Sequence, residues 1–232
     1  MRMKVLSMAL AGLALAGCKD EAPAPEPLPA ATPSTSASAE IAGPQINVLA
    51  FGDSLFAGYG LAKPELSYPA RLEEALRQGG RNVKIVNAGV SGDTTAAGRQ
   101  RFTFTLDAQV QKPDLVLLEL GGNDLLRGLP PEQTRQNLDA MLAELKARGI
   151  PVALFSLQAP PNYGAKWQAQ FDGTYGALAA KYGVPLVPFV TEKVFAKPDL
   201  LQPDRVHPTA KGVEVLVADT LAAVTLALPA GD

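Results

Sequence analysis

Four short clusters of small and polar residues carry the side chains that could do chemistry. The clusters are Gly52-Asp53-Ser54-Leu55, Gly89-Val90-Ser91-Gly92-Asp93, Gly121-Gly122-Asn123-Asp124 and Pro203-Asp204-Arg205-Val206-His207-Pro208. A serine hydroxyl is a weak nucleophile until a base takes its proton, and that base needs an orienting carboxylate. The sequence contains one histidine, so the base must be His207. We therefore expect Ser54 to be the nucleophile, His207 its base and Asp204 the orienting acid.

Acyl transfer also needs hydrogen-bond donors that point at the developing oxyanion. Three donors are available in the clusters: the side-chain amide of Asn123, the backbone N–H of Gly92, which no side chain screens, and the N–H of Ser54 itself. Pro208 suits the first turn of a helix, so we expect His207 at the entrance of the last helix.

Each cluster also has an ordinary structural interpretation. A Gly-Asp-Ser sequence after a strand is often a turn or a helix cap, and a histidine before proline is often a cap or a surface residue. Gly92 could serve only a positive φ angle. Asp53, Asp93 and Asp124 could be helix N-caps or supporting residues. Alternatively, these three carboxylates could hold Mg²⁺ for phosphoryl chemistry, because that ion prefers hard oxygen ligands.

The elements that must position these residues alternate along the chain. Apolar runs predict strands at 46–51, 83–87, 115–120, 152–157 and 185–189, and amphipathic stretches predict helices at 66–77, 94–110, 132–148, 165–182 and 209–226. This alternation predicts an α/β fold with a parallel sheet and helices on both faces. Ligands of such sheets bind beyond the carboxyl ends of the strands, and every cluster follows a predicted strand. That coincidence favours the catalytic interpretation.

The N-terminus is typical of an export signal. Arg2 and Lys4 precede an apolar run at 5–17, which is too short to cross a bilayer core of about 30 Å as a helix. The run ends in Leu15-Ala16-Gly17-Cys18, which resembles a bacterial lipobox. The resemblance implies cleavage before Cys18 and its acylation, and several acyl chains make a stable membrane anchor. An ordinary secretory signal with a chance cysteine is the alternative.

Composition divides the chain further and limits its partners. Residues 19–44 contain six of the 20 prolines and little apolar bulk, which is typical of a disordered tether. We therefore predict a signal peptide at 1–17, a lipidated cysteine and tether at 18–44, and one folded domain at 45–232. The net charge of −2 gives no reason to expect nucleic acid as a partner, and the single cysteine excludes an internal disulfide.

The clusters resemble the sequence blocks of the GDSL/SGNH hydrolase family over roughly residues 46–211. Gly52-Asp53-Ser54-Leu55 is similar to the nucleophile block, Gly92 and Asn123 occupy the positions of the oxyanion glycine and asparagine, and Asp204 and His207 those of the acid and base. The closest likeness is to the bacterial periplasmic branch of thioesterase, arylesterase and lysophospholipase enzymes. The segments that carry this likeness are 119–124, 126–128 and 162–164.

The resemblance implies a three-layer flavodoxin-like sandwich with a five-stranded parallel sheet and no lid. It also implies a mobile apolar loop at 125–131 that touches an acyl chain. Leu125, Leu126 and Leu129 are therefore candidate substrate contacts, and simple packing at a helix start is their alternative role.

We expect a lipid-anchored serine esterase of the cell envelope that faces the periplasm. It would act as a monomer without a cofactor or metal on small acyl esters, thioesters or lysophospholipids. A carbohydrate or peptidoglycan O-deacetylase and a non-catalytic envelope-binding lipoprotein are the alternatives.

Overall fold

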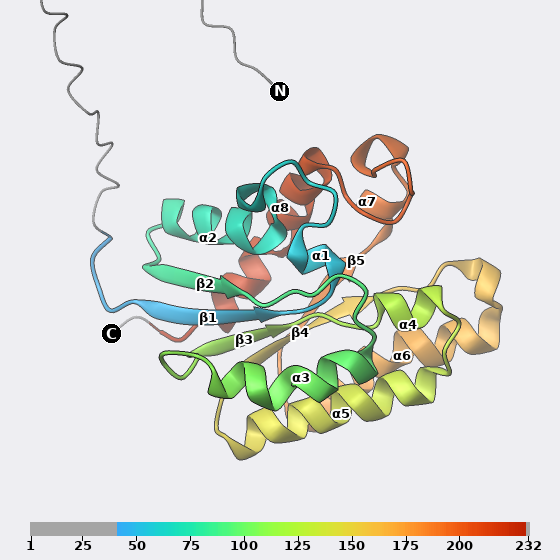
Figure 1. The fold of residues 1–232 in the computed structure, drawn as a ribbon, viewed down its shortest axis with the longest axis horizontal. Helices are drawn as coiled ribbons and strands as arrows, with labels where there is room; N and C mark the ends of the chain where they lie inside the picture. Colours follow the sequence, from blue (N-terminus) through green and yellow to red (C-terminus); the bar gives the residue numbers. More distant parts are fainter. Residues whose placement is uncertain (1–40, 231–232) are drawn as a thin grey trace, which may run out of the picture. The chain divides into compact units, whose positions relative to one another are not determined.

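A parallel sheet of five strands forms the centre of the computed structural model, which describes residues 41–230 (Figure 1). Its strands are β1 (Ile46–Phe51), β2 (Val83–Asn87), β3 (Leu115–Leu118), β4 (Val152–Leu157) and β5 (Leu186–Val190). They lie in the order β2-β1-β3-β4-β5, and all neighbouring pairs are parallel. The chain moves outward from β1 in both directions, so the switch in strand order lies between β1 and β3. Ligand crevices form at this point in open α/β sheets.

Helices cover both faces of the sheet, which confirms the predicted three-layer α/β class. One face carries α2 (Tyr68–Gln78) and α8 (Ala210–Ala227), and the other carries α3 (Thr95–Asp107), α5 (Pro131–Ala147) and α6 (Ala165–Tyr182) (Figure 1). No helix among the described residues is both long enough and apolar enough to cross a membrane. The predicted signal peptide, Cys18 and all of the predicted tether before residue 41 lie outside the described residues.

The predicted elements are all present, with ends that move by a few residues. The helix at 165–182 has the bounds we expected, whereas β3 ends at Leu118 and not at residue 120. One local expectation was wrong. Pro208 is not in the first turn of the last helix, because α8 begins at Ala210 and Thr209 is its N-cap, accepting a hydrogen bond from the Gly212 N–H (3.2 Å).

Short elements that the sequence did not predict lie between the main ones. They are the α-helices α1 (Ser54–Ala57), α4 (Gly122–Leu126) and α7 (Glu192–Phe195), and the 3₁₀ turns η1 (Pro64–Leu66), η2 (Pro161–Tyr163) and η3 (Pro198–Leu200). The first two begin within a few residues of the ends of β1 and β3, the two strands that flank the switch point.

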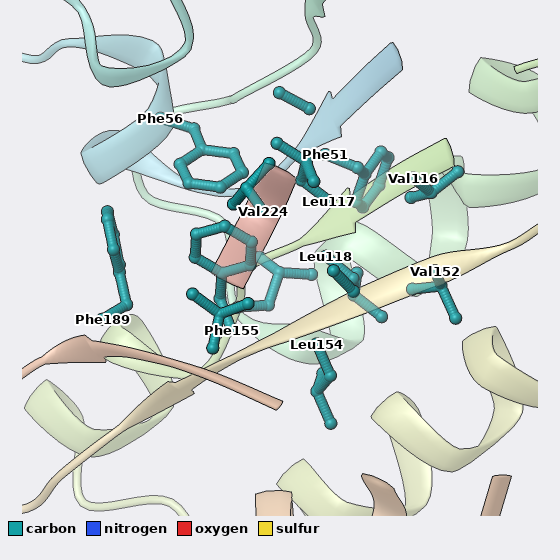
Figure 2. Close-up of a cluster of buried hydrophobic side chains, with 14 of the residues drawn as sticks. Phe51, Phe56, Val116, Leu117, Leu118, Val152, Leu154, Phe155, Phe189 and Val224 are labelled. Atoms are coloured by element: carbon teal, nitrogen blue, oxygen red, sulfur yellow. The ribbon is translucent and has the colours of Figure 1, made fainter. Parts of the chain in front are cut away.

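An aromatic cluster fixes the helix α1 to the sheet. Phe56 of this helix stacks on Tyr68 with ring centroids 5.3 Å apart, and it meets Phe155 and Phe189 edge-on at 5.3 and 5.7 Å. Figure 2 shows Phe56, Phe155 and Phe189 together in the core. All four rings are almost completely buried. Because protein cores are close-packed, the residues of α1 are held rigidly against this cluster.

Candidate active site

Ser54 is the first residue of α1 and directly follows the turn at the end of β1. Asp53 caps the helix, because its Oδ1 accepts the N–H of Leu55 (3.0 Å). A Cβ atom at Gly52 would lie 2.8 Å from both the Glu119 carboxylate and the Phe56 ring, so the close packing beneath this turn requires glycine. The Ser54 side chain is thus held in a fixed turn at the sheet edge.

Asp204 and His207 lie in the loop between η3 and α8 and are joined to Ser54 by a chain of contacts. The Oδ2 atom of Asp204 lies 2.7 Å from Nδ1 of His207, and Nε2 of His207 lies 2.9 Å from Oγ of Ser54. The other carboxylate oxygen of Asp204 accepts the backbone N–H groups of Val206 (2.9 Å) and His207 (3.0 Å). This arrangement can take a proton from a serine hydroxyl and stabilise the imidazolium that results.

The Asp204 carboxylate is ionised at neutral pH. Partial burial of this group would raise its pKa, but the hydrogen bonds from the backbone and ring of His207 and from the Val206 N–H lower the pKa to about 2. A negative charge therefore faces Nδ1 of the imidazole throughout the neutral range.

Gln202 fixes the His207 loop to the segment after α1, a role that sequence analysis missed. Its backbone N–H donates to the His207 carbonyl (2.7 Å), and its side-chain amide donates to the carbonyls of Tyr59 (2.8 Å) and Pro208 (3.0 Å). The Tyr59 ring lies 4.6 Å from the imidazole, centroid to centroid. No local sequence pattern identifies Gln202, because the Tyr59 carbonyl that its side chain binds comes from a distant part of the chain.

Asn123 lies in the first turn of α4, and its Nδ2 donates to Oδ2 of Asp53 (3.1 Å). The preceding Gly121 has a φ angle of 124°, and a Cβ atom there would collide with the hydroxyl of Tyr175. The structure therefore brings Asn123 next to the turn that carries Ser54, as the sequence predicted.

Gly92 lies in the turn before α3, where its φ angle is +88°. Its carbonyl accepts a hydrogen bond from Arg127 (3.0 Å), which places this turn beside the end of α4. Within residues 41–230, the N–H groups of Ser54 and Gly92 donate to no protein acceptor. Both groups are therefore free to bind an oxygen atom of a ligand.

A cavity of about 610 Å³ opens beside Ser54. Its apolar wall includes Leu55, Leu125, Leu126, Leu157, Ala159, Val190 and Phe195. Two of the three predicted acyl contacts, Leu125 and Leu126, are thus at the cavity. The third, Leu129, does not line it, because the chain turns away after α4 and the Leu129 N–H bonds to the carbonyl of Asp124 (2.9 Å). Gly92 also lies outside the lining residues.

The other acidic residues of the clusters have structural partners. Asp93 pairs with Arg101 (2.6 Å) and is not a helix cap, because Thr94 caps α3. Asp124 is buried and accepts the backbone N–H of Thr95 (2.7 Å) and the hydroxyl of Thr134 (3.2 Å). Within residues 41–230, no group of three His, Cys, Asp or Glu side chains is placed to hold a metal ion. The alternative Mg²⁺ site of Asp53, Asp93 and Asp124 is therefore not formed.

A second carboxyl group lies below Asp53. Glu119, directly after β3, has no exposed surface, and its Oε2 accepts the N–H of Asp53 (3.3 Å). Burial raises the pKa of Asp53 to about 6. Burial, and then the charge of Asp53, raise the pKa of Glu119 well above its usual range. The sequence analysis did not single out Glu119, although a charged residue within the apolar run 115–120 could have drawn attention to it.

Comparisons with known proteins match the same region. A model of the GDSL-like lipase/acylhydrolase family matches residues 50–215. An arylesterase of Vibrio mimicus is 42% identical over 161 residues, 69% of this chain and 79% of that protein. The thioesterase 1/protease 1/lysophospholipase L1 of Escherichia coli K12 is 38% identical over 175 residues, 75% of this chain and 81% of that protein. The crystal structure of AlinE4, an SGNH-hydrolase family esterase, is 61% identical and has a TM-score of 0.68, covering 82% of this chain and 100% of that chain.

The family match extends from the end of β1 to the start of α8, and it therefore contains the serine turn, α4 and the histidine loop. The similar proteins are named as esterases and a thioesterase. All three agree with this chain in sequence, and AlinE4 agrees in fold as well. The protein is thus an ester-hydrolysing enzyme, and it belongs to the GDSL-like lipase/acylhydrolase family.

Proposed function

We propose that the protein is a serine esterase of the cell envelope that cleaves small acyl esters or thioesters through Ser54, His207 and Asp204. The observation that carries this proposal is the chain of contacts from Ser54 Oγ to His207 Nε2 (2.9 Å) and from His207 Nδ1 to Asp204 Oδ2 (2.7 Å). These distances are those of a nucleophile, a general base and an orienting acid in hydrogen-bond contact.

In the proposed reaction, Ser54 Oγ attacks the carbonyl carbon of the substrate while its proton moves to Nε2 of His207. The tetrahedral intermediate collapses when the same proton passes to the leaving alcohol or thiol, which leaves an acyl group on Ser54. Water then attacks this ester and gives a proton to His207, and the second tetrahedral intermediate releases the carboxylic acid as His207 returns that proton to Ser54 Oγ. Asp204 keeps the imidazole in the required tautomer and stabilises its charged form.

We propose that three donors stabilise the oxyanion: the N–H groups of Ser54 and Gly92 and the side-chain amide of Asn123. The two backbone groups have no acceptor among the described residues. The amide of Asn123 has two N–H donors, and Asp53 accepts only one of them. Removal of one such donor typically lowers kcat by about 10²–10³-fold.

The cavity supports the proposed class of substrate. Its volume of about 610 Å³ and its apolar wall suit a short- to medium-chain acyl group beside Ser54. The relatives that are named as arylesterase and as thioesterase and lysophospholipase fit the same range of small acyl substrates.

Hydrolysis of p-nitrophenyl esters from C2 to C12 by the purified full-length chain tests this proposal. S54A and H207A should each lower kcat by at least about 10³-fold while circular dichroism shows a folded protein. The chain-length optimum then measures the acyl pocket. Turnover that persists in folded S54A would refute the assignment of the nucleophile.

We further propose that the chain is a lipoprotein anchored to the envelope through acylated Cys18. The sequence Leu15-Ala16-Gly17-Cys18 after a short apolar run supports this proposal. A tether at 19–44 would then leave the folded domain free to meet substrates near the membrane surface.

A further inference from the structure

Glu119 is a buried carboxyl group that the proposed reaction does not use. Its exposed fraction is 0%, it follows the apolar strand β3, and within the described residues its Oε1 atom has no hydrogen-bond partner. Ionising a carboxyl group in the apolar core costs free energy, and so does leaving one of its oxygens without a hydrogen-bond partner. A buried polar group of this kind therefore needs an explanation.

The contacts of Glu119 lead directly to the oxyanion amide. Its Oε2 accepts the backbone N–H of Asp53 (3.3 Å), and the two carboxyl groups lie close enough for the charge of Asp53 to raise the pKa of Glu119. The Asp53 carboxylate accepts the Leu55 N–H at one oxygen (3.0 Å) and the Asn123 amide at the other (3.1 Å). Glu119, Asp53 and Asn123 thus lie in series, with Glu119 bonded to the Asp53 backbone and the Asp53 carboxylate bonded to the Asn123 amide.

The proton between the two carboxyl groups belongs to Glu119. Two carboxylates in contact cannot both ionise at low cost, so one of them keeps a proton. Asp53 receives two donors that stabilise its anion, whereas Glu119 receives one long hydrogen bond. Glu119 is therefore the donor, and Asp53 is the acceptor.

We propose that Glu119 is a positioning residue that acts through its neighbours: protonated Glu119 donates to the Asp53 carboxylate and so fixes the Asn123 amide toward the oxyanion. This inference rests on the proposed function, in which Asn123 donates to the oxyanion. With one amide N–H held by Asp53, the second N–H has a defined direction before substrate binds, and such preorganisation is what makes an oxyanion donor effective.

The first test compares two replacements of Glu119. E119Q keeps the size of the side chain and an N–H that can donate to Asp53, so we expect a kcat within about threefold of wild type. E119M keeps the bulk but not the donor, so we expect kcat to fall about 10- to 100-fold with KM within about twofold, because the lost interaction forms in the transition state. Equal losses in E119Q and E119M would overturn the proposal.

A double-mutant cycle with N123A separates positioning from general damage. If Glu119 acts through Asn123, E119M should lower kcat by less than about twofold in the N123A background. If E119M lowers kcat by the same factor in both backgrounds, this inference fails. If N123A itself keeps wild-type kcat, the oxyanion assignment in the proposed function fails instead.

Two further variants distinguish a loss of positioning from a loss of stability or folding. Y182F removes a hydroxyl that bonds to Asp139 (2.8 Å) at the C-terminal end of α6, and it should lower the melting temperature without changing kcat. If E119M does not fold, E119D takes its place in the cycle. E119D keeps a buried acid but shortens its reach by one methylene, so it should show the same loss of kcat, and wild-type kcat in E119D would refute the proposal.

Discussion

Asp204 uses its two carboxylate oxygens for different purposes. One oxygen accepts two backbone N–H groups and so shapes the loop, and the other faces Nδ1 of His207. The same side chain thus builds the turn and orients the ring. The two purposes can be separated, because an asparagine still offers one oxygen to the backbone.

We expect D204N to keep the conformation of the loop but to lose most of the catalytic activity. Its amide oxygen can accept the N–H groups of Val206 and His207, but its amide nitrogen cannot accept from Nδ1, so His207 adopts the wrong tautomer. By analogy with other serine hydrolases, kcat should fall by about 10²–10⁴-fold. Kinetics with p-nitrophenyl acetate and thermal unfolding measure the two effects, and D204A should show the lower melting temperature of the two variants.

The buried carboxyl pair should make stability fall as the pH rises through weakly acidic values. The pKa of Asp53 is about 6 in the folded chain and 3.8 in its usual range, so the folded state holds this proton more tightly. Its contribution to the free energy of unfolding is complete below about pH 3.8 and is lost as the pH rises through 6, a change of about 3 kcal/mol.

The neutral double variant D53N/E119Q lacks this titration. Thermal unfolding of wild type and variant between pH 4 and 7 should therefore show wild type losing stability relative to the variant as the pH rises. Because the acids elsewhere in the fold are common to both proteins, their titration cancels in the difference. A difference in melting temperature that stays constant over this range would contradict the assignment of a raised Asp53 pKa.

The loop between η3 and α8 owes its position to one residue that contacts two separate segments. Gln202 binds the backbone of His207 and Pro208 within its own loop and the Tyr59 carbonyl after α1. It therefore fixes the distance between the helix that carries Ser54 and the loop that carries His207.

We expect Q202A to loosen this connection without unfolding the domain. Loss of the side-chain hydrogen bonds should lower the free energy of unfolding. Each kcal/mol lost in this way should lower the melting temperature by about 2–4 °C. kcat should fall about tenfold, because small displacements of catalytic groups slow the chemical step. K193A is the matched control, since Lys193 forms an exposed ion pair with Asp219. Equal kcat in Q202A and K193A would show that the loop does not need Gln202.

The same elements show what the sequence can and cannot predict. Strands were predictable because buried parallel strands are continuous apolar runs. The positions of Ser54 and Asn123 at the sheet edge were predictable because each comes shortly after one of these strands, whereas their catalytic roles stay predictions. The helices α1 and α4 were missed because each has only four or five residues, too few for a periodic pattern. The roles of Glu119 and Gln202 depend on long-range contacts that no local pattern encodes.

At the scale of the whole molecule, the folded domain and its predicted anchor have separate tasks. All contacts that join Ser54, His207 and Asp204 lie within residues 54–207, whereas Cys18 precedes the described residues. Replacement of Cys18 should therefore change where the enzyme is found without changing its intrinsic rate.

We expect C18A to move the protein from the membrane fraction to the soluble fraction, because the residue that we propose to be acylated is lost. Its kcat with p-nitrophenyl acetate should equal that of wild type in detergent. Fractionation of the producing cells with immunoblotting measures the first effect. A C18A protein that stays in the membrane fraction would argue against an anchor at this residue.

The cavity has a consequence for how such an enzyme can diversify. Its far wall is built from residues at the ends of β4 and β5 and in α7, such as Leu157, Val190 and Phe195, whereas Ser54 and Asn123 follow β1 and β3. The pairing of β1 with β3 (Phe51 beside Leu118) sets the positions of the nucleophile and of the Asn123 amide independently of that wall. Substitutions in this wall can therefore change which acyl group the enzyme accepts, while the nucleophile and the Asn123 amide keep their positions.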